Sequence, residues 1–233
     1  PDGGWAMLYT GVGSAEDGLV QRIGLARSAD LHTWVKHPQN PVVEADPRWY
    51  EMLNLDVWFD QAWRDPWAVL DVASGLFHAF ITARSNLGDP DQRGVIGHAT
   101  SPDLTSWVVG PPIRSPQGFG YMEVPQVLRM GGRWHLLFSA PAWAQSARPA
   151  PRCTGTFHAV ADEIEGPYDE RATLACDAVG SQYGGKVLQT SSGPVFLAFR
   201  NQDSDGRFLG GITNPTQIDI APNGAFTLVE SPP

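Results

Sequence analysis

Two acidic residues of this chain stand in short motifs that could carry chemistry. Asp65 follows Arg64 in the tripeptide RDP, and Glu123 begins the tripeptide EVP 58 residues later. Cleavage of a glycosidic bond needs two carboxyl groups around a sugar, one that donates a proton and one that acts as nucleophile or stabilises positive charge. Asp65 and Glu123 can do this only if the fold brings both to one pocket.

The elements that must position these residues are revealed by an internal repeat. Residues 23–34 read IGLARSADLHTW and residues 96–107 read IGHATSPDLTSW, with seven of the twelve positions identical. Weaker copies of the surrounding unit begin at EVPQVLRM and at YGGKVLQT. Short apolar or alternating runs closed by Gly, Asp, Asn, Ser or Pro predict strands, and no run predicts a helix of ten residues. A four-stranded unit that recurs in this way is typical of a β-propeller.

The repeat itself is predicted to be scaffold. Ser or Asp ahead of Leu in a turn accepts hydrogen bonds from backbone amides, and the following Trp can cover the apolar face of the next blade. Functional groups are expected instead on the innermost strand of each blade, which lines the central channel. Three such strands open with the segments AWRDPWAV, GYMEVPQV and GSQYGGKV. The residues therefore predicted to converge on one axial pocket are Arg64, Asp65, Glu123 and Tyr183.

These motifs, taken in order, resemble a known group of enzymes. Tyr9-Thr10-Gly11, Arg64-Asp65-Pro66, Glu123-Val124-Pro125 and the Ser-x-Asp-Leu-x-x-Trp turns are similar to those of glycoside hydrolase families 32 and 68, the invertases, inulinases, levanases and levansucrases. The resemblance implies an all-β fold, a five-bladed β-propeller of four-stranded antiparallel blades. About four blades are represented in this chain, as a single catalytic domain over residues 1–233 that is incomplete at its N-terminal end. The implied activity is retaining hydrolysis of β-fructofuranosyl linkages in sucrose, fructooligosaccharides or fructans, with transfer to a second sugar as a variant.

The resemblance also implies a role for each matching residue. Glu123 aligns with the general acid/base, and its enclosure by apolar neighbours would favour the protonated form that a proton donor needs. Asp65 aligns with the carboxylate that stabilises the oxocarbenium-like transition state. The residues expected to bind substrate are Arg64, Tyr183, Trp63 and Gln126.

The chain departs from the family pattern in two ways. The motif around Glu123 reads Glu-Val-Pro where family 32 usually has Glu-Cys-Pro. More importantly, the family's nucleophile, an Asp on the innermost strand of the first blade, has no counterpart before Tyr9, so we expect it to lie upstream of this chain. Asp56 and Asp60 are the nearby substitutes, and both are expected on a loop at the rim of the pocket.

Composition excludes several other functions. The net charge of -9 and the lack of clustered Lys and Arg argue against nucleic-acid binding, and no apolar run is long enough to span a membrane. The six His are scattered without paired spacing, so no metal site and no cofactor is expected. Cys153 and Cys176 either pair or stay free. A neutral carbohydrate remains the expected partner, while the cellular location and the oligomeric state are left open.

Two alternatives remain open at this level. A propeller similar to glycoside hydrolase family 43, an arabinofuranosidase or xylosidase, also uses two Asp and one Glu in its channel but inverts configuration. A propeller that binds carbohydrate without turnover would explain the missing nucleophile. The Ser-x-Asp-Leu turns and the Glu-x-Pro motif favour the fructoside enzyme.

Overall fold

The computed structural model describes residues 3–146, 152–168 and 171–229, and these residues form four antiparallel sheets. Each sheet is a meander of strands that are consecutive in the sequence. In order, the strands are β1 (Trp5–Val12), β2 (Gln21–Ser28) and β3 (Val35–Lys36); β4 (Trp63–Asp71), β5 (Leu76–Arg84), β6 (Gly94–Ser101) and β7 (Val108–Gly110); β8 (Glu123–Met130), β9 (Arg133–Ala140), β10 (Thr154–Ala161) and β11 (Arg171–Asp177); β12 (Gln182–Thr190), β13 (Gly193–Arg200), β14 (Thr216–Ile220) and β15 (Phe226–Leu228).

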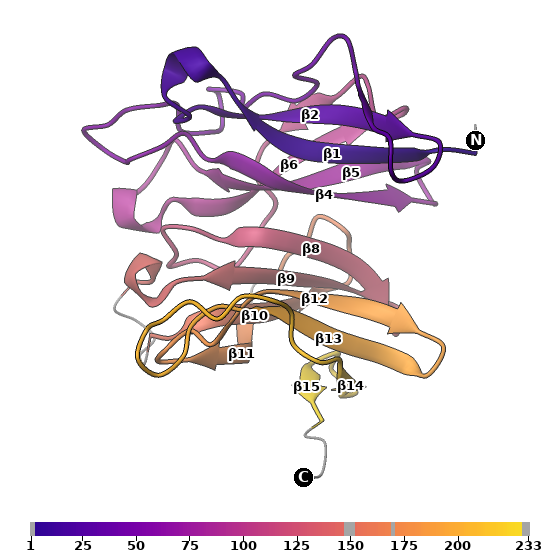
Figure 1. Cartoon of the computed structure of the whole chain (residues 1–233), viewed down its shortest axis with the longest axis vertical. Helices are drawn as coiled ribbons and strands as arrows, with labels where there is room; N and C mark the ends of the chain where they lie inside the picture. Colours follow the sequence, from indigo (N-terminus) through magenta and orange to yellow (C-terminus); the bar gives the residue numbers. More distant parts are fainter. Residues whose placement is uncertain (1–2, 147–151, 169–170, 230–233) are drawn as a thin grey trace.

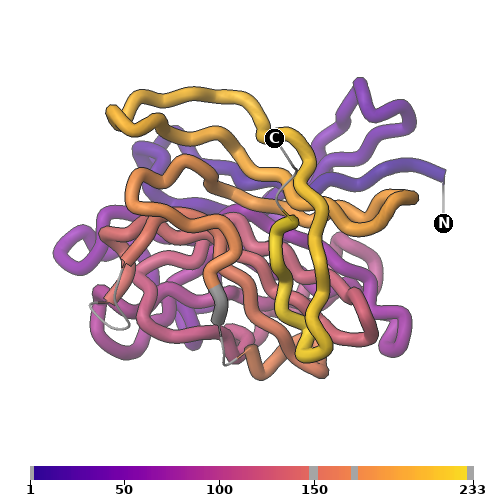
Figure 2. Tube along the Cα trace, turned by 90° about the horizontal axis from the view of Figure 1, so that it is seen from below, coloured from indigo at the N-terminus to yellow at the C-terminus, as the bar shows by residue number. Residues whose placement is uncertain are grey.

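The sheets follow one another along the long axis of the molecule. Figure 1 shows them in chain order, from β1 and β2 at the indigo end to β14 and β15 at the yellow end. Figure 2, seen from below, has the yellow strands in front of the orange ones and the indigo N-terminal part behind. Contacts join β1 to β4, β4 to β8 and β8 to β12. This stacking of meanders confirms the propeller blades predicted from the repeat.

The first sheet has one strand fewer than the others. In it, β1 pairs with β2 as β5 pairs with β6 in the second sheet, and the two copies of the repeat place Ile23 in register with Thr10 and Ile96 in register with Thr82. Strand β1 is therefore the equivalent of β5, the second strand of a blade. Among the described residues, the first sheet contains no equivalent of β4, β8 or β12.

Side chains that alternate along each strand fill the spaces between sheets. On β5, Ala79 and Ile81 belong to the cluster shared with the first sheet, whereas Phe80 belongs to the cluster shared with the third. On β9, Leu136 faces the second sheet and Leu137 faces the fourth. Because successive residues of a strand point to opposite faces, a strand buried on both sides is mostly apolar. Three interleaved cores hold the four sheets together.

The two copies of the repeat form outer turns, the first between β2 and β3 and the second between β6 and β7. The hydroxyl of Ser101 accepts hydrogen bonds from the amides of Asp103 and Leu104, at 3.2 and 2.8 Å. The Asp103 carboxylate accepts from the amides of Thr105 and Ser106, both at 2.8 Å. The first copy makes the same bonds at the corresponding positions. These bonds confirm that the repeat is scaffold.

Two further expectations were tested by the fold. Cys153 and Cys176, whose pairing the sequence left open, form a disulfide that ties the start of β10 to β11. The only helical segments in the described ranges are three 3-10 turns, η1 (Ser14–Glu16), η2 (Pro90–Gln92) and η3 (Ala142–Ala144). No helix in this part of the chain has the length and apolar character needed to cross a membrane.

Candidate active site

The three innermost strands share a β-bulge at the same place. The pairing of β4 with β5 shifts between Arg64 and Trp67, that of β8 with β9 between Glu123 and Gln126, and that of β12 with β13 between Tyr183 and Lys186. A bulge inserts one extra residue and re-aims the neighbouring side chains. The residues that open the three bulges, Arg64, Glu123 and Tyr183, therefore occupy equivalent positions in three blades.

The residue that follows the opening position adopts positive φ in each bulge. The values are 56° at Asp65, 50° at Val124 and 62° at Gly184. Each of these residues donates its amide to a hydroxyl on the second strand of the preceding sheet. The bonds are Asp65 N to Thr10 Oγ1 at 3.0 Å, Val124 N to Thr82 Oγ1 at 3.2 Å, and Gly184 N to Ser139 Oγ at 3.0 Å. One hydrogen bond, repeated between successive sheets, thus fixes the strained backbone.

The equivalent side chains of the three bulges meet. Arg64 Nη2 donates to Glu123 Oε1 at 2.5 Å, and the hydroxyl of Tyr183 donates to Glu123 Oε2. The side chains of Arg64 and Glu123 are 15% and 23% exposed, so the pair is mostly shielded from bulk water but open on one side. Burial, with the charge of Glu123 next to it, raises the pKa of Tyr183 well above its ordinary value. Tyr183 therefore remains a neutral donor to the carboxylate.

Arg64 is held on its other side by Asp60. Arg64 Nη1 donates to Asp60 Oδ2 at 3.2 Å, and the same carboxylate accepts from Gln21 Nε2 at 3.2 Å and from the hydroxyl of Tyr121. The guanidinium also lies 4.5 Å from the centre of the Tyr121 ring. Burial by itself lowers the pKa of Arg64, but the charges of Glu123 and Asp60 raise it overall. The guanidinium is a fixed cation between two carboxylates.

Asp65 directs its carboxylate to a different set of donors. Its Oδ2 accepts from Thr82 Oγ1 at 2.9 Å and from the amide of Val124 at 3.2 Å, and it lies 3.7 Å from Arg64 Nε. The side chain is 28% exposed. The carboxylate of Asp65 therefore lies beside the bulge that carries Glu123.

Trp63 and Gln126, both predicted to bind substrate, lie apart from this group of side chains. Trp63 is fully buried in the core between the first and second sheets and lies against Tyr50, with ring centres 4.6 Å apart. Gln126 is 2% exposed, and its amide group both donates to and accepts from the backbone of Val187 on β12, at 2.9 and 2.7 Å. Neither side chain has a free face for a ligand.

Asp56 and Asp60, both expected at the rim, lie in different surroundings. Asp56 is exposed in a turn where its amide donates to Asn54. Asp60 is drawn into the site, and its side chain is only 11% exposed. Because its carboxylate already accepts three hydrogen bonds, its position is best explained as an anchor for Arg64.

Lys186 is a charged group of the site that sequence reasoning missed. Its Nζ donates to the carbonyl oxygens of Val124 and Pro125 at 2.7 and 3.1 Å, so it braces the backbone directly after Glu123. Burial lowers the pKa of Lys186 to about 8, although the charge of Asp65 opposes the shift. Aligning the segment YGGK with EVPQ places Lys186 at the position of Gln126, at the end of the bulge, but it does not reveal that Lys186 contacts the preceding blade.

Comparisons with known proteins point to enzymes that act on fructosides. No family model matches the chain. A fructan 6-exohydrolase of Beta vulgaris is 27% identical over 123 residues, 51% of this chain and 18% of that protein. A GH32 beta-fructofuranosidase of Bombyx mori has a TM-score of 0.68 at 16% identity, covering 98% of this chain and 48% of its own. An inulosucrase from Halalkalicoccus jeotgali bound to kestose has a TM-score of 0.75 at 18% identity, covering 97% and 67%.

These matches define the class of fold. The chain is an all-β propeller of the kind seen in the fructofuranosidase and inulosucrase structures, which confirms the predicted resemblance to glycoside hydrolase families 32 and 68. The chain spans about half the length of the Bombyx mori protein and less than a fifth of the Beta vulgaris protein.

Proposed function

We propose that this chain carries the general acid/base and the transition-state stabiliser of a retaining enzyme that acts on β-fructofuranosyl linkages. The observation that carries the proposal is the convergence of three equivalent bulges, which brings Arg64, Glu123 and Tyr183 into direct contact and sets Asp65 beside them. The similarity to a fructan 6-exohydrolase and to a beta-fructofuranosidase supports the proposed substrate class. A fifth blade, beyond the four sheets described, is part of the same proposal.

In the proposed reaction, Glu123 protonates the glycosidic oxygen and later removes a proton from the acceptor, water or a second sugar. The hydrogen bond from Tyr183 and the charge of Arg64 hold the Glu123 carboxyl group in one orientation. Asp65 remains close enough to the same bulge to stabilise positive charge at the reacting carbon. The nucleophile that a retaining mechanism requires has its expected place on an innermost strand of the first blade, a position with no counterpart among the described residues.

The first test is Glu123→Gln in a protein that carries the proposed nucleophile as well as this chain. The substitution removes the transferable proton and preserves the side-chain volume. With sucrose, inulin and levan as substrates, we expect turnover to fall by about 10³-fold or more, because general acid catalysis is lost. Glu44→Gln serves as the matched control, since Glu44 pairs with Arg22 on the first sheet at an exposed position. Full activity in Glu123→Gln would overturn the assignment.

The substrate panel also separates the two alternatives. Release of arabinose or xylose from aryl glycosides, with inversion at the anomeric carbon, would favour the family 43-like reading. Binding of fructans without any product would favour a carbohydrate-binding propeller. Release of fructose with retained configuration supports the proposed enzyme.

A further inference from the structure

The second and third sheets each contain a pair of buried histidines at equivalent positions. His78 on β5 and His98 on β6 place Nδ1 and Nε2 3.0 Å apart. His135 on β9 and His158 on β10 do the same, with the same two atoms at 3.0 Å. His78 lies four residues before Thr82 and His135 four residues before Ser139, so the two pairs share one place in the blade.

The surroundings of the two pairs differ. Phe226 of the fourth sheet stacks on His135 and His158, with ring centres 4.4 and 4.1 Å away, and His135 Nε2 lies 3.0 Å from the carbonyl oxygen of Met130. This pair is covered by an apolar ring and has a partner for its second nitrogen. It is therefore explained by packing alone.

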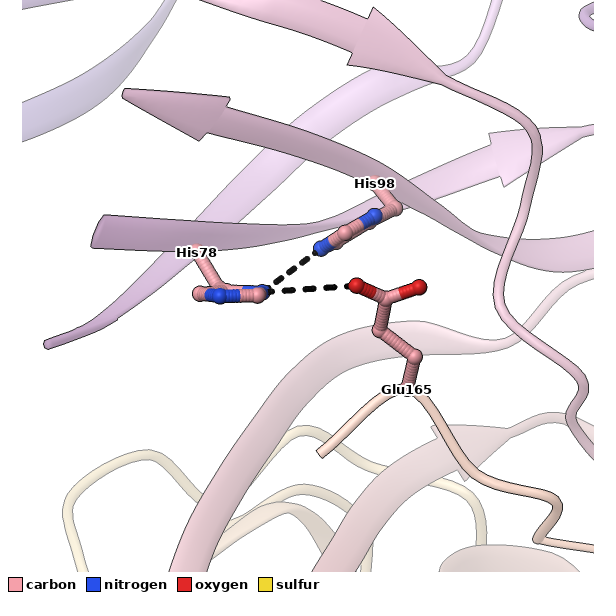
Figure 3. A group of neighbouring side chains, drawn as sticks. All are labelled: His78, His98 and Glu165. Carbon is pink, nitrogen blue, oxygen red and sulfur yellow. Dashed lines mark hydrogen bonds and ion pairs between the residues drawn. The ribbon is translucent and has the colours of Figure 1, made fainter. Parts of the chain in front are cut away.

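The pair in the second sheet faces a carboxylate in addition to an aromatic ring, that of Phe80, whose centre lies 6.4 Å from that of His78 and 5.6 Å from that of His98. Glu165, from the outer turn between β10 and β11, brings Oε1 to 4.0 Å from His78 Nδ1. Figure 3 shows the two imidazole rings and the carboxylate pointing toward one another. His78 Nε2 is buried and has no hydrogen-bond partner in the described part of the chain. Packing and hydrogen bonding therefore do not fully explain the pair formed by His78 and His98.

We propose that His78 Nδ1, His98 Nε2 and the Glu165 carboxylate bind a divalent transition-metal ion of the Zn²⁺ type. Two imidazole nitrogens and a carboxylate are a common zinc ligand set, with water as the fourth ligand. The three ligand atoms lie within 4.8 Å of one another. Tetrahedral coordination at the usual bond lengths separates ligand atoms by about 3.3 Å, so the nitrogens need to part by only a few tenths of an ångström.

Glu165 is built to complete this set from the neighbouring blade. Its side chain is 58% exposed, so it can turn to close the remaining distance. The turn that carries it is fixed by Tyr168, whose amide donates to the carbonyl oxygen of Arg114 at 2.9 Å and whose hydroxyl donates to that of Ile164 at 3.0 Å. A bound ion would tie the second sheet to the outer turn of the third. The inference is independent of the proposed glycosidase activity.

Linear spacing gave no sign of this site, and the sequence predicted no metal. His78 and His98 are 20 residues apart, and Glu165 follows 67 residues later. They meet because two histidines sit on diagonal positions of adjacent strands, while the glutamate arrives from the next blade. The proposal therefore departs from the expectation that the chain has no metal site.

The test is a titration of the chelator-treated protein with Co²⁺, followed by its visible ligand-field bands, and then with Zn²⁺ by calorimetry. We expect one equivalent of Co²⁺ with tetrahedral bands that Zn²⁺ abolishes. Glu165→Gln should weaken binding at least about tenfold, because the charged ligand is lost while the fold is unaffected at this exposed position. Glu163→Gln, two residues away on the same turn, is the matched control and should bind as the original protein does.

Two further variants exclude other sources of the signal. His98→Gln should abolish the tetrahedral bands, with folding verified by circular dichroism. A variant that replaces the exposed His32 and the half-buried His37 by Gln should retain the tetrahedral bands. The proposal is overturned if the original protein gives no tetrahedral Co²⁺ bands, if Glu165→Gln and His98→Gln bind as tightly as the original, or if the double replacement of His32 and His37 removes binding.

Discussion

The outer turns and the inner bulges of this propeller both recur from blade to blade, but the turns recur with their side chains and the bulges recur in their backbone alone. The turns that begin at Ser28 and Ser101 share their backbone and their side chains, and every side-chain bond to the backbone recurs in both. The bulges share their backbone and their hydroxyl bond to the preceding sheet, but they open with Arg64, Glu123 and Tyr183. Recurring side chains serve the fold, whereas different side chains on a recurring backbone assemble a site.

The histidine pairs are an intermediate case that supports this distinction. The same residue types occupy the same positions in two blades, but Phe226 covers one pair and Glu165 faces the other. Equivalent positions can therefore serve packing in one blade and form a candidate site in another. The difference comes from the residue that the neighbouring blade places against the pair.

The largest effect is expected from Asp65→Asn, because Asp65 belongs both to the bulge backbone and to the proposed chemistry. Asn tolerates positive φ and can still accept the hydrogen bond from Thr82, so the bulge should be preserved. Loss of the charge should lower kcat on a fructoside by about 10²–10³-fold. Steady-state kinetics with sucrose measure this. A higher KM with unchanged kcat would reassign Asp65 to substrate binding.

Gln126→Leu tests whether a bulge neighbour serves the fold. The substitution leaves the buried N–H and C=O of Val187 without their partners, which should cost about 2–4 kcal/mol of unfolding free energy. Denaturant titration gives this value, and KM measured at a temperature where the variant is folded should be unchanged. Unchanged stability together with a raised KM would support the sequence-based expectation that Gln126 binds substrate.

The outer turns are tested by Ser101→Ala and Ser28→Ala. Each removes a hydroxyl that accepts two backbone amides, so each should lower the free energy of unfolding by about 1–2 kcal/mol and leave activity unchanged. Equal losses in the two variants are the key result, since the turns are copies. A change in kcat for either variant would contradict the view that the turns are scaffold.

Much of this arrangement followed from the sequence because the repeat marks a fixed point in each blade. Counting back from the outer turn located the inner strands, and the structure brings Arg64, Glu123 and Tyr183 together there. Strand alternation explains why Trp63 lies apart from this group: Trp63 directly precedes Arg64, so its side chain points to the opposite face of the sheet.

The remaining parts depend on bulges and on neighbouring blades, which a sequence pattern does not reveal. Gln126 lies beyond a bulge, where the count of inward and outward positions changes by one. Asp60 enters the site only because Tyr121 and Gln21, from other parts of the chain, supply its hydrogen bonds. Glu165 reaches the histidine pair from another sheet.

The smallest effects are expected from exchanging residues at the strained bulge position. A Cβ added at Gly184 meets no atom within 4 Å, so Gly184→Ala should cost only the strain of positive φ, about 1 kcal/mol. Val124 has the same backbone with a β-branched side chain, so Val124→Gly should release similar strain and gain up to about 1 kcal/mol, reduced by the entropy of glycine. Denaturant titration of both variants gives the change in unfolding free energy. A loss in Gly184→Ala and a gain in Val124→Gly would show that the sheets impose the bulge backbone, through the hydroxyls of Ser139 and Thr82. A large loss in Val124→Gly would mean instead that the Val124 side chain holds the bulge beside Glu123.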